Sequence, residues 1–63
     1  MTNRVKEFRE KLGLSQEELA KVSKVSRKTI SGLETNTLKV VTSTTMINIC
    51  RALDRSFNDI FGF

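Results

Sequence analysis

The chain has 63 residues with 11 basic and seven acidic side chains, a formal net charge of +4, no histidine, no proline and one cysteine, Cys50. One cysteine forms no internal disulfide and, without histidine, supplies no ligand set for structural zinc, so we expect neither metal nor cofactor. The length predicts one domain over residues 1–63, and the lack of a signal-peptide pattern or a membrane-length apolar run predicts a cytoplasmic protein without a membrane partner.

Basic residues are concentrated in the first two thirds of the sequence. Residues 1–39 contain nine Lys or Arg and five Asp or Glu, whereas residues 40–63 contain two residues of each sign. The whole excess of +4 therefore lies before residue 40, which indicates one surface that faces a polyanion and a second, neutral surface. A basic surface that is only solvated is the alternative that charge alone leaves open.

Three apolar residues near the start of the chain, Val5, Phe8 and Leu12, have the i, i+3 and i+7 spacing of an amphipathic helix. We therefore predict a helix over residues 3–12 with these side chains on its apolar face. Gly13 suits the left-handed backbone at which many helices end.

Two capping signals, eleven residues apart, predict two further helices. Ser15 with Glu18 three residues later is a capping box, which begins a helix that ends near residue 23. Ser26 begins the next helix, and the three-residue spacing of Ile30 and Leu33 predicts that both point inward. Two short helices joined by so short a turn form the helix-turn-helix arrangement.

Two more helices are predicted after an extended loop over residues 35–42, which is rich in β-branched residues and ends in a cap at Thr42 or Ser43. Apolar residues at 3.6-residue spacing mark the fourth helix, and a capping box at Ser56 and Asp59 begins a short fifth helix. The apolar residues of these two helices are Met46, Ile49, Cys50, Leu53, Phe57, Ile60 and Phe61, with Phe57 expected in the core. The predicted fold class is all-α, with five short helices.

The third predicted helix begins with two cations, Arg27 and Lys28, where the helix dipole disfavours positive charge. An unfavourable position suggests a reason outside the chain, and DNA is the natural one. Arg and Lys donate to O6 and N7 of guanine, while Ser and Thr bond base edges or phosphates. The polar residues available for these contacts are Ser26, Arg27, Lys28, Thr29 and Ser31.

Residues 14–34 resemble the helix-turn-helix of the phage repressor and Cro type, also called the Xre family. The matching elements are GLSQEELA at 13–20, VSRKTIS at 25–31 and the Leu33-Glu34 pair, with weaker matches at 49–53 (ICRAL) and 57–61 (FNDIF). The resemblance covers most of the chain. It implies a lambda-repressor-like domain that binds double-stranded DNA through its third helix.

The resemblance also implies roles for individual residues. Base contacts fall to Arg27, Lys28 and Ser31, and backbone or mixed contacts fall to Gln16, Ser26, Thr29 and Asn36. Arg9 and Glu34 match an ion pair that joins the first helix to the end of the third. Lys24 stands where the family usually has Gly, which predicts a positive φ, and Gly32 replaces a longer side chain, which removes one base contact.

We predict a sequence-specific transcriptional regulator, a repressor that binds a palindromic operator as a homodimer. The neutral part of the chain should form the dimer interface, with Ile60, Phe61 and Phe63 as its apolar residues. The sequence offers no nucleophile and base pair, so we do not expect an enzyme. The alternative is a protein-binding module, antirepressor-like or antitoxin-like, on a helix-turn-helix scaffold. An apolar exposed face on the third helix would favour that alternative.

Overall fold

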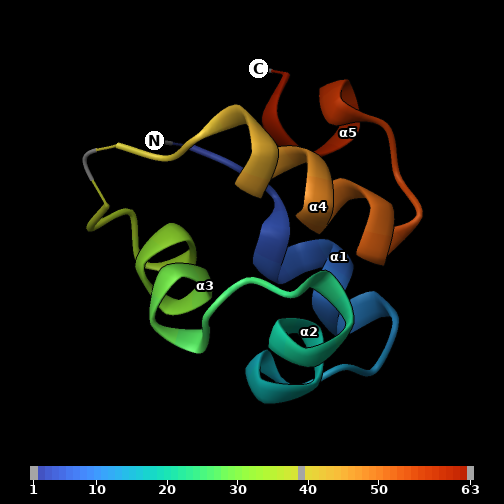
Figure 1. Ribbon diagram of the computed structural model, residues 1–63. Helices are drawn as coiled ribbons and strands as arrows, with labels where there is room; N and C mark the ends of the chain where they lie inside the picture. Colours follow the sequence, from blue (N-terminus) through green and yellow to red (C-terminus); the bar gives the residue numbers. More distant parts are fainter. Residues whose placement is uncertain (1, 39, 63) are drawn as a thin grey trace.

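The computed structural model describes residues 2–38 and 40–62, and its regular structure consists of helices alone (Figure 1). The predicted all-α class and the five short helices are confirmed. No helix in these two ranges has the length and apolar character needed to cross a lipid bilayer. The helices are α1 (Val5–Lys11), α2 (Gln16–Ser23), α3 (Arg27–Glu34), α4 (Ser43–Leu53) and α5 (Phe57–Phe61).

Four helices begin at a Ser or Thr whose side-chain oxygen accepts a hydrogen bond from the backbone N–H three residues later. These caps are Ser15, Ser26, Thr42 and Ser56, and those at Ser15 and Ser56 are complete capping boxes, as predicted. The first helix differs, because α1 follows Arg4, which makes no side-chain cap. Asn3 instead accepts from the N–H of Val5 at 3.0 Å.

The chain turns sharply after each of the first four helices at a residue with positive φ. Gly13 has φ 72°, and the other three positions are not glycine: Lys24 (58°), Asn36 (58°) and Asp54 (54°). The predicted left-handed backbone at Lys24 is therefore present. This conformation costs a non-glycine residue roughly 1–2 kcal/mol, so the packing of the helices must offset it.

The core lies where all five helices meet, and α4 packs against α1, α2 and α5 (Figure 1). Its fully buried side chains are Val5, Leu19, Ile30, Leu33, Ile49, Leu53 and Ile60.

The predictions for Leu12 and Phe57 were wrong. Leu12 is 53% exposed because it follows the last residue of α1, beyond the part of that helix that the core covers. Phe57 is 43% exposed because Ile60, one turn later, takes the core position of the five-residue α5.

Candidate nucleic-acid interface

The outer face of α3 carries the residues predicted to contact bases. At about 100° per residue, Arg27, Lys28 and Ser31 fall within an arc of about 100°, opposite the buried Ile30 and Leu33. Arg27 and Lys28 are exposed and Ser31 is half-buried. The structure therefore brings the three predicted base-contact residues together on one surface.

Arg27 and Lys28 have no acidic partner within residues 2–38 and 40–62, where every ion pair involves other residues. The first turn of α3 contains no acidic residue, so both cations also lie at the positive end of the helix dipole. Lys24, in the turn just before, is exposed as well. Three cations thus surround the start of α3 without neutralisation by the described residues.

Ser26 and Thr29 share one hydrogen-bond arrangement at the start of α3. The hydroxyl of Ser26 accepts from the N–H of Thr29 at 3.2 Å and donates to the hydroxyl oxygen of Thr29 at 2.9 Å. The proton of the Thr29 hydroxyl then remains for another acceptor. Of these two predicted contact residues, Thr29 is accordingly the better placed to donate to DNA.

Arg9, Gln16 and Glu34 form a cluster that ties α1, α2 and α3 together. Arg9 donates from Nε to Oε2 of Glu34 at 2.7 Å and from Nη2 to Oε1 at 3.0 Å. Its Nη1 donates to the carbonyl of Leu14 at 2.6 Å. Gln16 adds a third donor to Glu34, from Nε2 to Oε1 at 3.1 Å. The ion pair implied by the resemblance is thus present, and Gln16 extends it.

The positive charge of Arg9 and the negative charge of Glu34 neutralise each other in a largely enclosed site, where the two side chains are 11% and 3% exposed. Burial alone would raise the pKa of Glu34, but hydrogen bonds from Arg9 and Gln16 together with the positive charge of Arg9 bring that pKa below its ordinary value. The hydrogen bond to Glu34 raises the pKa of Arg9. The pair therefore stays ionised at neutral pH and fixes the end of α3 against α1.

Asn36 lies just beyond α3 in the left-handed conformation, and it is exposed. Its N–H donates to the carbonyl of Leu33 at 3.3 Å, and the N–H of Thr37 donates to the carbonyl of Gly32 at 2.9 Å. These two bonds are the Schellman arrangement, which closes the end of a helix. They leave the side-chain amide of Asn36 at the surface.

Gly32 does not face outward, although the resemblance placed a longer side chain there. It is buried, and a Cβ built on it would lie 2.6 Å from Cγ of Leu38. A longer side chain at this position would first have to displace Leu38. No pattern in the sequence indicated this packing.

A comparison with protein-family models matches residues 5–60 to the family described as helix-turn-helix. That match spans α1 to the buried Ile60 of α5, and so includes the whole arrangement described above. The chain belongs to the helix-turn-helix family of the phage repressor and Cro type. No curated protein matches the sequence.

Members of this helix-turn-helix family are DNA-binding regulators, and the chain is one of them. The α2–α3 pair is its helix-turn-helix, with α3 in the position of the recognition helix.

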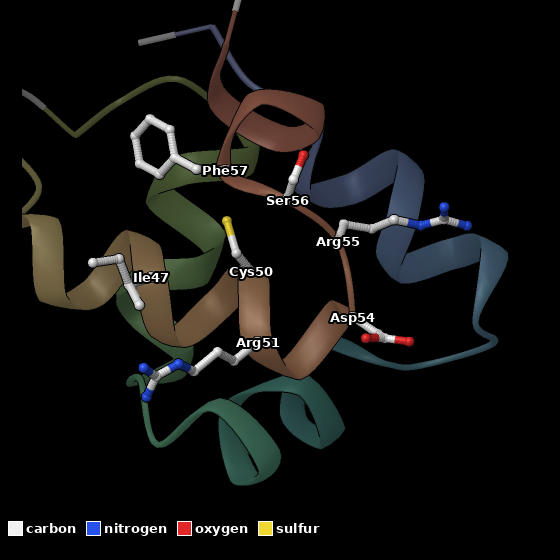
Figure 2. Close-up of a pocket in the computed structure, with 7 residues that line it drawn as sticks. All are labelled: Ile47, Cys50, Arg51, Asp54, Arg55, Ser56 and Phe57. Carbon is white, nitrogen blue, oxygen red and sulfur yellow. The ribbon is translucent and has the colours of Figure 1, made fainter.

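A second surface, between α4 and α5, was not predicted as a groove. The cavity here has a volume of about 380 Å³. Figure 2 shows Ile47 and Cys50 on α4 and Phe57 on α5 around it, with the guanidinium groups of Arg51 and Arg55 pointing away from each other. Ile47 and Phe57 are both exposed apolar residues. The helical period of α4 identified its buried side and offered no reason to single out Ile47 on the other side.

The residues predicted for a dimer interface have three different positions. Ile60 is fully buried in the core of the single chain, so its assignment to an interface is corrected. Phe61 is half-buried, and its ring lies 5.4 Å from that of Phe57, centroid to centroid. Phe63 lies outside the described residues. The exposed apolar surface of this region is therefore formed by Ile47 and Phe57, and the half-buried Phe61 lies beside Phe57.

Proposed function

We propose that the protein is a cytoplasmic transcriptional repressor that binds a palindromic operator as a homodimer, with α3 in the major groove. The observation that carries this proposal is the unneutralised cationic surface of Arg27 and Lys28, on the same arc as Ser31. A protein-binding module would call for apolar residues on that arc, and α3 has none there.

Base reading is assigned to Arg27, Lys28 and Ser31. Arginine can donate two bonds to O6 and N7 of one guanine, and lysine can donate to the same atoms. The hydroxyl of Ser31 is short, so it reaches a base edge only where the helix backbone lies close to the DNA.

Contacts with the DNA backbone are assigned to residues at the two ends of the base-reading surface of α3. Gln16 uses one N–H of its amide on Glu34, and the amide has a second N–H that can donate to a phosphate oxygen. At the other end of α3 the side-chain amide of Asn36 is exposed. Thr29 and Ser26 lie between them at the start of α3. Contacts of this kind fix the register of the protein on DNA without reading sequence.

The dimer is assigned to the α4–α5 groove. In Figure 1, α3 and α5 lie on opposite sides of the chain with α4 between them, so a contact through α5 leaves α3 uncovered. Half-sites one helical turn apart require recognition helices about 34 Å apart, or about 17 Å from the two-fold axis. The protein measures 25 × 22 × 19 Å, which is large enough to reach that distance. Ile47, Phe57 and Phe61 would supply the apolar contacts.

The central experiment is selection of bound sites from a random duplex pool, followed by binding to single-base variants of the selected site. We expect a palindromic site, and Arg27→Ala or Lys28→Ala should weaken binding by about 1–3 kcal/mol and relax preference at one base pair in each half-site. Lys11→Ala is the matched control, because Lys11 is an exposed cation paired with Glu7 on α1. Wild-type affinity and preference in both α3 variants would refute the assignment of α3.

Sedimentation tests the dimer. Phe57→Ser with Phe61→Ser should shift the protein towards monomer and weaken operator binding, because the two copies no longer bury apolar rings against each other. Leu12→Ser is the control, since it removes an exposed apolar side chain just after α1 that does not line the groove. A wild-type protein that is monomeric both free and on its site would overturn the dimer.

A further inference from the structure

The side chain of Leu38 occupies the space where any side chain at position 32 would begin. A Cβ built on Gly32 would lie 2.6 Å from Cγ of Leu38 and 3.2 Å from each of its Cδ atoms. Real Cβ atoms essentially never approach another heavy atom as closely as the first of these distances. Leu38 can therefore pack on α3 at this depth only because residue 32 is glycine.

The carbonyl of Gly32 holds the same segment from the backbone side. It accepts from the N–H of Thr37 at 2.9 Å and from the N–H of Leu38 at 3.4 Å. The hydroxyls of Thr35 and Thr37 each lie 3.5 Å from this oxygen. Gly32 thus holds residues 35–38 in two ways. Its carbonyl oxygen accepts their hydrogen bonds, and its lack of a side chain leaves room for Leu38.

Glycine inside a helix is unfavourable, because it is the poorest helix former apart from proline. Gly32 lies in the interior of α3, which runs over Arg27–Glu34. Its φ is not in the left-handed range, so the backbone itself does not require glycine there. The requirement comes from Leu38.

We propose that the packing of Leu38 on Gly32 positions residues 35–38 for contact with the DNA backbone, and that Leu38 is a positioning residue in DNA binding. The proposal rests on the proposed function, in which Asn36 meets a phosphate. Asn36 stands at the turn between α3 and Leu38, with left-handed backbone and an exposed side chain. Its position relative to α3 is fixed on one side by the bond to Leu33 and on the other by Leu38. Displacement of Leu38 moves Asn36 away from the phosphate while the base-reading surface of α3 stays in place.

The test measures affinity for the selected operator and for its single-base variants in Gly32→Ala, Leu38→Ala and the double variant, and in Leu38→Ala combined with Asn36→Ala. In either single variant affinity should fall by a similar factor on the selected site and on its single-base variants, because a contact with the DNA backbone carries no sequence information. In an Asn36→Ala background, Leu38→Ala should cause no further loss, because the contact that it positions is already absent. In the double variant the methyl group introduced at position 32 enters the space that the leucine side chain vacates. We expect that variant to lie closer to wild type than the two single changes together predict.

Val40→Ala is the control, because Val40 lies in the same loop but is 82% exposed. It should leave affinity and base preference unchanged. Circular dichroism distinguishes a variant that has unfolded from one in which only Asn36 has moved. If Gly32→Ala does not fold, the comparison of Leu38→Ala with Val40→Ala makes the same test. A wild-type protein that binds no DNA refutes the proposed function. If the wild-type protein binds its site while Leu38→Ala keeps wild-type affinity, or loses as much affinity in the Asn36→Ala background as alone, the positioning role alone is refuted.

Discussion

Replacement of Glu34 by alanine should destabilise the fold strongly, because it leaves the guanidinium of Arg9 charged and largely buried. Glu34 accepts two hydrogen bonds from Arg9 and one from Gln16. All three donors lose their acceptor in Glu34→Ala. Arg9 then retains only its bond to the carbonyl of Leu14.

The expected loss follows from the enclosure of the pair, whose side chains are 11% and 3% exposed. Removal of one partner from a buried ion pair costs about 3–5 kcal/mol. A chain of 63 residues has a free energy of unfolding of about 3–9 kcal/mol. The variant should therefore lose a third or more of its stability, and its melting temperature should fall by at least about 12 °C.

Thermal and urea unfolding of Arg9→Ala, Glu34→Ala and the double variant would measure this coupling. The two single effects should not add, because the second substitution removes a charge that the first has already stranded. Glu7→Ala is the control, since its contact with Lys11 is 3.3 Å long but half-exposed and should contribute under about 1 kcal/mol. Additive effects, or a loss no larger than that of the control, would refute the reasoning.

Three further results are expected. Lys24→Gly should raise the free energy of unfolding by up to about 1 kcal/mol in urea titrations, because glycine adopts φ 58° without the strain of lysine but loses more backbone entropy on folding; a loss of stability would contradict this. Acidification should remove the stability contributed by ionised Glu34, whose pKa is lowered in the folded protein. This contribution is fully present above the pKa of the unfolded chain and is lost as the pH falls through the folded pKa. In melting curves measured against pH, Glu34→Gln should lack this loss. Cys50 should react slowly with a thiol reagent until the protein unfolds, since burial and the charge of Asp59 raise its pKa; rapid reaction in the folded state would argue against it.

The features that the sequence predicted well are those set by neighbours within a few residues. The caps at Ser15, Ser26 and Ser56 depend on a hydroxyl and an N–H three residues away, so the sequence contains both partners. The positive φ at Lys24 followed from the resemblance, because the family usually has glycine at this position. The spacing of Ile30 and Leu33 identified the buried side of α3, and hence its outer face.

The features that it missed depend on residues brought together by the fold. Leu12 and Phe57 satisfy helical spacing, but their exposure is decided by which other helices cover them. The packing of Leu38 on Gly32 joins a loop without periodicity to a residue without a side chain, so neither forms a pattern. Ile60 was predicted at the dimer interface, whereas α5 turns it fully inward.

The cluster around Arg9 has a consequence for how the protein folds. One side chain of α1 holds both the carbonyl of Leu14, where the helix-turn-helix begins, and Glu34, where it ends. An excised peptide of residues 14–36 would lack this clamp between its two ends, and its helices are only eight residues each, too short to persist alone in water. The DNA-reading geometry therefore arises only when α1 has docked, which favours all-or-none assembly over the gradual growth of a preformed motif.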